Sequence, residues 1–117
     1  MRGRCVLTVQ LGLVGPQLEQ ARAFFAQPLA EKLRIRADAN NRGYTAFGEE
    51  TLDPAQRRGD TKEGLYFGRE VSADSPEARK PLHGPNQWPD AAALPRFRPT
   101  MEAYLAACTE LGHRCGV

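Results

Sequence analysis

The strongest constraint on the fold is the stretch SADSPEARKPLHGPNQWPDAAALP, which occupies residues 72–95 of the 117-residue chain. Proline interrupts it at Pro76, Pro81, Pro85, Pro89 and Pro95. Proline has no backbone N–H, and it disrupts both helix interiors and central strands. Because so long an irregular segment is unusual inside a compact domain, we expect a belt that packs on a surface supplied by something else. Leu82 and Trp88 would be its anchors.

Helical periodicity precedes this belt. Leu18, Ala21 and Phe25 recur at helical spacing in QLEQARAFFAQ, with Phe24 beside them, which predicts a helix. Pro16 suits the first turn of that helix, where a missing N–H costs nothing.

A second, short helix is predicted for PLAEKLRIR, which Pro28 opens. Leu29 and Leu33 would share one face, while Lys32 and its charged neighbours point elsewhere.

A third helix is predicted from Phe97 to Leu111, with Gly112 as its cap. Its apolar face consists of Phe97, Met101, Tyr104, Leu105, Cys108 and Leu111. The two shorter helices offer few large apolar residues to cover it, so we expect part of the face to stay exposed.

Three segments are strand candidates: a buried strand over residues 5–11, YTAF (44–47), and EGLYFGREV (63–71). The N-terminal stretch MRGRCVLTVQLGLVG mimics a leader peptide, but Thr8 and Gln10 interrupt it and no small-residue cleavage site follows. The predicted fold class is therefore α+β: a few helices, short strands and a long proline-rich irregular segment.

Composition excludes several classes of protein. Sixteen Lys and Arg against fourteen Asp and Glu give a net charge of +2, too small for a nucleic-acid binder, so the basic residues are interpreted as a solvated face. No apolar run has membrane-spanning length. Three cysteines are not a disulfide framework, and they favour a reducing, cytoplasmic location.

No strong catalytic motif is present. The chain has neither a glycine-rich phosphate loop nor a nucleophile elbow. We interpret His83 as a loop imidazole that donates to a backbone carbonyl. Cys108 and Cys115 would lie about 10.5 Å apart along a continuous helix, too far for one zinc ion, so Cys108 is interpreted as a small buried apolar residue.

The stretch NNRGYTAFGEETLDP (40–54) combines glycine and aromatic residues with two adjacent carboxylates, Glu49 and Glu50. On an extended backbone these carboxylates face opposite ways. One could point into a pocket while the other meets solvent, but two solvated loop acids are the simpler interpretation.

Five motifs occur in one order: ARAFFAQPLAEKLRIR, NNRGYTAFGEET, GDTKEGLYFGRE, PLHGPNQWP and LPRFRPTMEAYLAACTELGHR. Together they resemble the N-terminal region of iron(II)/2-oxoglutarate-dependent dioxygenases of the isopenicillin-N-synthase-like superfamily. The resemblance implies an atypical N-terminal strand segment over residues 1–15, a dioxygenase N-terminal-like domain over 16–114 and a tail over 115–117. That domain normally packs on a double-stranded β-helix core.

The resemblance also implies functional residues. Tyr44, Glu50 and Thr51 match a stretch beside the active-site mouth of relatives, so they are candidates to contact substrate, Glu50 above all. The partner would be the missing catalytic core, or another protein, bound through the Phe97–Leu111 face. No nucleic-acid or membrane partner is expected.

The chain departs from the family in lacking the His-x-Asp pair that helps hold iron in relatives, because Gly84 follows His83 and Arg114 follows His113. Fe(II) and 2-oxoglutarate are therefore implied for a full-length relative, with no catalytic or metal residue expected here. We expect a non-catalytic, truncated N-terminal domain that is inactive alone. The alternatives are a small protein-interaction module or a degenerate fragment without independent activity.

Overall fold

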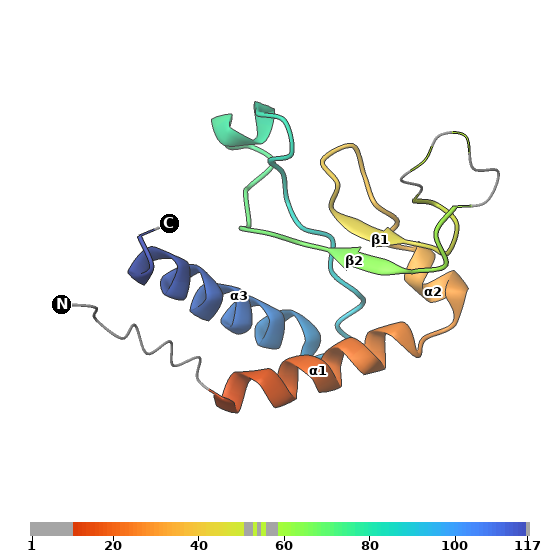
Figure 1. The fold of residues 1–117 in the computed structure, drawn as a ribbon, viewed down its shortest axis with the longest axis horizontal. Coiled ribbons are helices and arrows are strands. Elements are labelled where there is room, and N and C mark those ends of the chain that lie inside the picture. Colours follow the sequence, from red (N-terminus) through yellow and green to blue (C-terminus); the bar gives the residue numbers. More distant parts are fainter. Residues whose placement is uncertain (1–10, 51–52, 54, 56–58, 117) are drawn as a thin grey trace. The chain divides into compact units, whose positions relative to one another are not determined.

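The computed structural model describes residues 11–50, 53, 55 and 59–116, which form two compact units (Figure 1). One unit contains α1 (Leu11–Phe25) and α3 (Phe97–Arg114). The other spans residues 26–89 and contains α2 (Leu29–Leu33), β1 (Gly43–Thr45), β2 (Gly64–Tyr66) and the 3-10 helix η1 (Pro76–Arg79). Helices combined with a two-stranded sheet confirm the α+β class.

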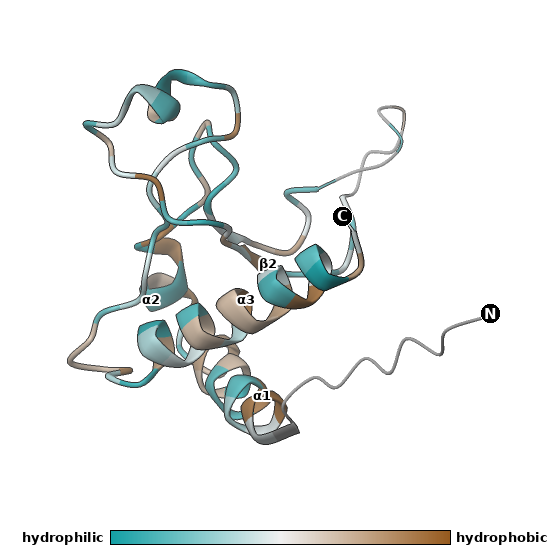
Figure 2. Ribbon diagram, turned by 90° about the vertical axis from the view of Figure 1, so that its left-hand side faces the viewer, coloured by the Kyte–Doolittle hydropathy of each residue, from teal (hydrophilic) through white to brown (hydrophobic). Residues whose placement is uncertain are grey.

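The helical unit is held together by aromatic packing between α1 and α3. Phe24 is fully buried, with its ring centroid 5.2 Å from that of Phe25 and 5.6 Å from that of Phe97. Phe97 and Met101 are also buried. Burying each such side chain stabilises the fold by about 1.5–3 kcal/mol. Figure 2 shows hydrophobic and hydrophilic stretches on both helices, as amphipathic packing requires.

Helix α1 corrects two predictions. It begins at Leu11, so residues 11–15 of the predicted strand segment are helical, while residues 1–10 lie outside the described part of the chain. A short apolar run such as LGLVG does not distinguish strand from helix. Pro16 consequently lies inside the helix, where it cannot donate to the carbonyl of Gly12. Leu18 is largely exposed, and Phe24 takes the central core position.

Helix α3 begins at Phe97 as predicted but continues beyond Gly112, which does not cap it. The cap is Cys115, and Gly116 follows at φ +75°, donating its N–H to the His113 carbonyl over 3.1 Å. Four apolar-face residues are only half-buried: Tyr104, Leu105, Cys108 and Leu111. The fully buried residues Phe97 and Met101 lie in the first turns of α3. Cys108 lies further along the helix and is therefore less buried than predicted.

The second unit is built around β1 and β2, which pair antiparallel where strands were predicted but over shorter spans. The segment after α2 joins the far side of β1: Tyr44 donates its N–H to the Ile35 carbonyl over 2.7 Å, and Ala37 donates to the Tyr44 carbonyl over 2.9 Å. Gly43 makes this approach possible, because a Cβ there would lie 2.4 Å from the Ile35 oxygen.

The end of the proline-rich segment in this unit is secured by side-chain amides. Asn86 accepts a hydrogen bond from Gly68 N–H and donates one to the Gly68 carbonyl, at 2.9 and 2.7 Å. Gln87 donates to the carbonyls of Arg36 and Arg42, both at 2.7 Å.

The two predicted anchors of the belt, Leu82 and Trp88, differ in how far they are packed against other residues. Trp88 stacks against Phe67 at 5.5 Å and donates to Glu70 over 3.1 Å, so it has contacts within its own unit. Leu82 is 61 % exposed. Among the described residues, no helix combines the length and apolar character needed to cross a membrane.

Candidate functional site

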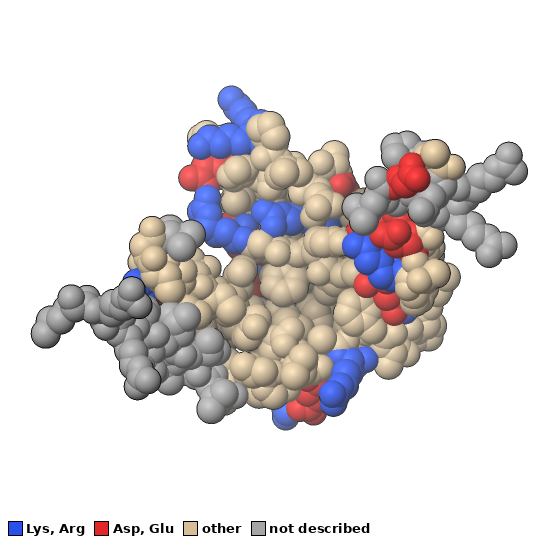
Figure 3. All heavy atoms as spheres, viewed as in Figure 1, with Lys and Arg blue, Asp and Glu red and all other residues tan. Residues whose placement is uncertain are grey.

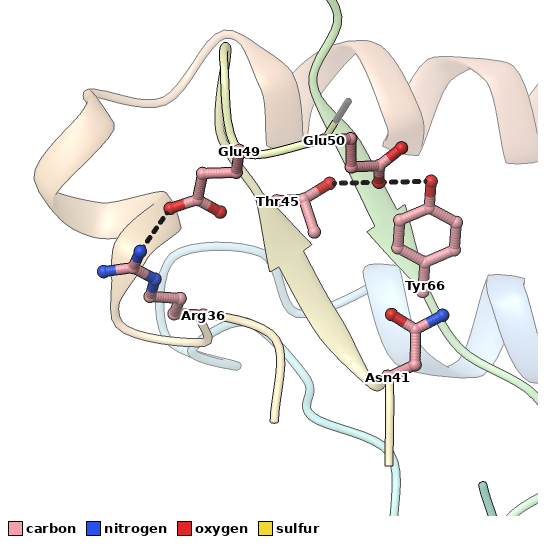
Figure 4. A pocket seen from close by; sticks show the side chains of 6 residues that line it. All are labelled: Arg36, Asn41, Thr45, Glu49, Glu50 and Tyr66. Atoms are coloured by element: carbon pink, nitrogen blue, oxygen red, sulfur yellow. Dashed lines mark hydrogen bonds and ion pairs between the residues drawn. The ribbon is translucent and has the colours of Figure 1, made fainter. Parts of the chain in front are cut away.

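The second unit carries a concavity lined by Arg36, Asn41, Thr45, Glu49, Glu50 and Tyr66 (Figure 4). Its lining comes from both strands and from the segments next to β1. Apart from the aromatic ring of Tyr66, the lining is polar or charged.

A turn after β1 brings the two acids to this concavity. Gly48 has φ +83°, a conformation that favours glycine, and Glu49 N–H donates to the Ala46 carbonyl over 3.2 Å. The chain then runs beside Asp60, which accepts from Gly48 N–H at 2.9 Å and donates to the Glu50 carbonyl at 2.6 Å. This turn explains why glycine precedes the two carboxylates.

The strand register supplies the other side of the concavity. Thr45 pairs with Gly64, and Tyr66 lies two residues further along β2, so Thr45 and Tyr66 share one face of the sheet. Gly64 leaves the space between them open, since a Cβ there would lie 3.2 Å from the Tyr66 ring and 3.3 Å from the Thr45 hydroxyl. Both side chains therefore reach Glu50.

Glu50 is held by three side chains. Its Oε1 accepts hydrogen bonds from the Thr45 hydroxyl at 3.1 Å and the Tyr66 hydroxyl at 2.7 Å. Its Oε2 lies 2.5 Å from Lys62 Nζ. The Lys62 ammonium first, and then the Tyr66 hydroxyl, lower the pKa of Glu50 to about 2. Glu50 is therefore an ionised carboxylate in a fixed orientation at neutral pH.

Glu49 is fixed as well. Its Oε1 lies 2.7 Å from the Arg36 guanidinium, and its Oε2 accepts from Ala46 N–H at 3.0 Å. Glu49 and Glu50 keep contact with solvent, as the interpretation of two solvated loop acids expects, but each carboxylate is also paired and lines the concavity. Basic and acidic side chains lie next to one another in several places in Figure 3.

Tyr44 lies on the opposite face of β1 and is fully buried. Its hydroxyl donates to Glu63 Oε2 at 2.5 Å, and Lys32 Nζ lies 2.7 Å from the same oxygen. Burial and the Glu63 carboxylate raise the pKa of Tyr44 to about 12. Burial acts to raise the pKa of Glu63, but hydrogen bonds from Lys32 and Tyr44 outweigh it and lower that pKa.

Lys32 corrects the prediction for α2. Its side chain is buried, whereas Leu29 on the supposed apolar face is largely exposed. The reason is chemical: Glu63 pairs with the ammonium group, and the Tyr44 ring lies 5.4 Å from Nζ. The apolar stem of Lys32 packs alongside the aromatic ring, while Glu63 neutralises its ammonium group, so burial leaves no charge unpaired.

Neither histidine lines the concavity. His83 Nδ1 donates to the Pro81 carbonyl at 2.8 Å, which confirms its interpretation as a loop imidazole. Among the residues that the structure describes, no three His, Cys, Asp or Glu side chains gather as a metal site would require.

The structure describes two of the three residues predicted to contact substrate, and they lie on opposite faces of the sheet. Glu50 lines the concavity, Tyr44 lies on the other face of the sheet, and Thr51 is outside the described residues. Sequence reasoning missed Thr45 and Tyr66. Side chains alternate between the two faces along GYT and GLY. With the pairing register known, this alternation would have placed both side chains on one face of the sheet.

Comparison with known proteins shows the family to which the chain belongs. Residues 8–91 match the family described as non-haem dioxygenase in morphine synthesis N-terminal. The chain belongs to this family of dioxygenase N-terminal domains. The match covers α1, α2, both strands and η1.

Three relatives of this dioxygenase N-terminal domain come from a plant and two fungi. It is 35 % identical to an azadirone synthase from Melia azedarach over 83 % of this chain and 29 % of the relative. A 2-oxoglutarate-Fe(II) type oxidoreductase from Emericella nidulans is 40 % identical over 80 % of this chain and 28 % of the relative. A 2-oxoglutarate-dependent dioxygenase from Aspergillus niger is 33 % identical over 91 % of this chain and 32 % of the relative. The chain thus spans under a third of each relative's length.

Proposed function

We propose that the chain is the non-catalytic N-terminal domain of a 2-oxoglutarate/Fe(II)-dependent oxidoreductase. The observation that carries the proposal is the family match over residues 8–91, in relatives that extend far beyond the matched region. The sparse cysteines support the cytoplasm as its compartment.

The residues that the structure describes do not fit an iron site. His83 uses Nδ1 for a backbone carbonyl, and the described residues bring no three metal-ligating side chains together. Iron and 2-oxoglutarate would be held by the remainder of a full-length protein. This domain contributes binding and positioning groups and carries out no oxidative step.

On the substrate side, the proposal places Glu50, Thr51 and Tyr44 near the substrate and assigns direct contact to Glu50. For Glu50 it is supported by a carboxylate that is ionised, oriented by two hydroxyls and open to the concavity. Tyr44 is buried, so in this chain its hydroxyl supports the sheet through Glu63.

On the partner side, the proposed occupant of the α3 apolar face is a double-stranded β-helix core. Support comes from the half-buried Tyr104, Leu105, Cys108 and Leu111, and from the length of the relatives outside the matched region. The alternative is a protein-interaction module, in which the same half-buried face of α3 would meet another protein.

A chimera tests the proposal. Residues 16–114 would replace the matching region of the Aspergillus niger dioxygenase, and substrate-dependent succinate formation would be measured. We expect turnover to persist, and Glu50→Ala to raise KM or change substrate preference. A well-folded chimera without turnover would contradict the assigned domain role, and unchanged kinetics for Glu50→Ala across several substrates would contradict the role of Glu50.

A further inference from the structure

The concavity around Glu50 has an unusual distribution of hydrogen-bonding groups. Each hydroxyl has a single proton to donate, and both Thr45 and Tyr66 donate theirs to Glu50 Oε1. Their oxygens can therefore only accept from a ligand. The ionised carboxylates of Glu49 and Glu50 are acceptors as well. These four side chains thus offer acceptors to whatever enters, while the donors of the lining are the Arg36 guanidinium and the Asn41 amide.

The cationic groups are at the exposed ends of long side chains. Arg36 and Lys62 have side chains 65 % and 56 % exposed, against 25 % and 31 % for their partners Glu49 and Glu50. Solvent screens exposed ion pairs, so they contribute little to stability. Lys62 can rotate away from Glu50, whereas Thr45 and Tyr66 are carried by paired strands.

Lys62 already shows which chemistry the lining accepts. Its ammonium group lies 2.5 Å from Glu50 Oε2 and also interacts with the Tyr66 hydroxyl. Lys62 is not itself part of the lining, but its ammonium group pairs with the Glu50 carboxylate that is, so a ligand's own cation would compete with Lys62 for Glu50.

We propose that the concavity binds the ammonium or guanidinium group of a ligand, with Glu50 as the anionic partner and Lys62 as an internal cation that the ligand displaces. The inference deepens the proposed function, because it gives the chemical class that Glu50 recognises. It is tested below by binding to the 117-residue chain alone, so its failure would leave the chimera result standing.

Four probes with short unbranched alkyl tails distinguish charge from shape. n-Butylguanidinium and n-butylammonium are cations, n-butylurea is neutral, and butyrate is an anion. Each is titrated into the isotope-labelled chain at fixed ionic strength, and amide shifts of Thr45, Glu50 and Tyr66 are followed. Both cations should move these signals, with n-butylurea at least about tenfold weaker, since charged hydrogen bonds are the stronger ones.

Three variants separate the proposal from a general charge effect. Glu50→Gln should weaken binding of n-butylguanidinium about tenfold. Lys62→Met should tighten it about threefold, because the competing ammonium is gone. Glu77→Gln removes another paired carboxylate of the same unit outside the concavity, and it should leave binding unchanged.

The Lys62 variant gives the sharper result, because it keeps Glu50 intact and tests the proposal even if Glu50→Gln fails to fold. The proposal is overturned if Lys62→Met weakens cation binding, if butyrate binds better than the cations, or if neither cation shifts the three signals. Equal binding to the Glu50→Gln and wild-type chains would overturn it as well.

Discussion

Two tyrosines on paired strands have opposite surroundings. Tyr44 is buried and donates to Glu63, which is paired with Lys32. Tyr66 lines the concavity and donates to Glu50, and that hydrogen bond raises its pKa. One side of the small sheet thus holds a buried polar network, while the other presents an oriented carboxylate.

Glu50 should make stability depend on pH in acid. A carboxylate whose pKa falls on folding stabilises the folded state above its unfolded pKa, and this contribution is lost as the pH falls toward the folded pKa. For Glu50 the window runs from 4.5 down to about 2. We expect the thermal midpoint of the wild type to fall more steeply across it than that of Glu50→Gln. Parallel circular-dichroism melting curves for the two proteins would contradict this.

The Lys32 network should be sensitive to single changes. Lys32→Met leaves the partly buried Glu63 carboxylate without its cation, and breaking a buried pair costs about 3 kcal/mol. Urea unfolding should show this loss. Lys32→Met combined with Glu63→Leu should recover most of it, because no unpaired charge remains. A single variant within about 0.5 kcal/mol of wild type would show that the network is not stabilising.

At the scale of elements, helical periodicity predicts the three helices, and β-rich composition predicts both strands. Periodicity failed where composition is ambiguous, as at LGLVG, which is helical from Leu11. It also failed for Lys32, because a buried cation is decided by a partner 31 residues away. The family resemblance singles out Glu50, but Thr45 and Tyr66 require a pairing register that no local pattern contains.

Substitution by alanine should change the free energy of unfolding in opposite directions at two glycines. Gly43 has φ +122°, and a Cβ there would lie 2.4 Å from the Ile35 oxygen, so Gly43→Ala should destabilise the chain by about 2 kcal/mol or more. Gly112 lies within α3 with open space around it, so Gly112→Ala should stabilise by about 0.5–1 kcal/mol. Chemical unfolding measures both. If both substitutions changed the free energy of unfolding by similar amounts in the same direction, the close approach of Gly43 to Ile35 would be contradicted.

At the scale of the whole molecule, the half-buried residues of the α3 face should make the isolated chain bind a hydrophobic dye or self-associate. Leu105→Lys should reduce ANS fluorescence. Ala106→Lys introduces the same charge at an exposed position of the helix and is the control. A sharply melting wild-type monomer that binds no dye would show that the chain covers its own apolar surface.

We propose that this N-terminal domain holds no iron–oxoglutarate chemistry of its own. Anaerobic titration of the isolated chain with iron(II) and 2-oxoglutarate tests it most directly, with the dioxygenase chimera as the positive control. We predict no metal-to-ligand charge-transfer band for the chain and a clear band for the chimera. A band from the isolated chain with stoichiometric iron would contradict the account.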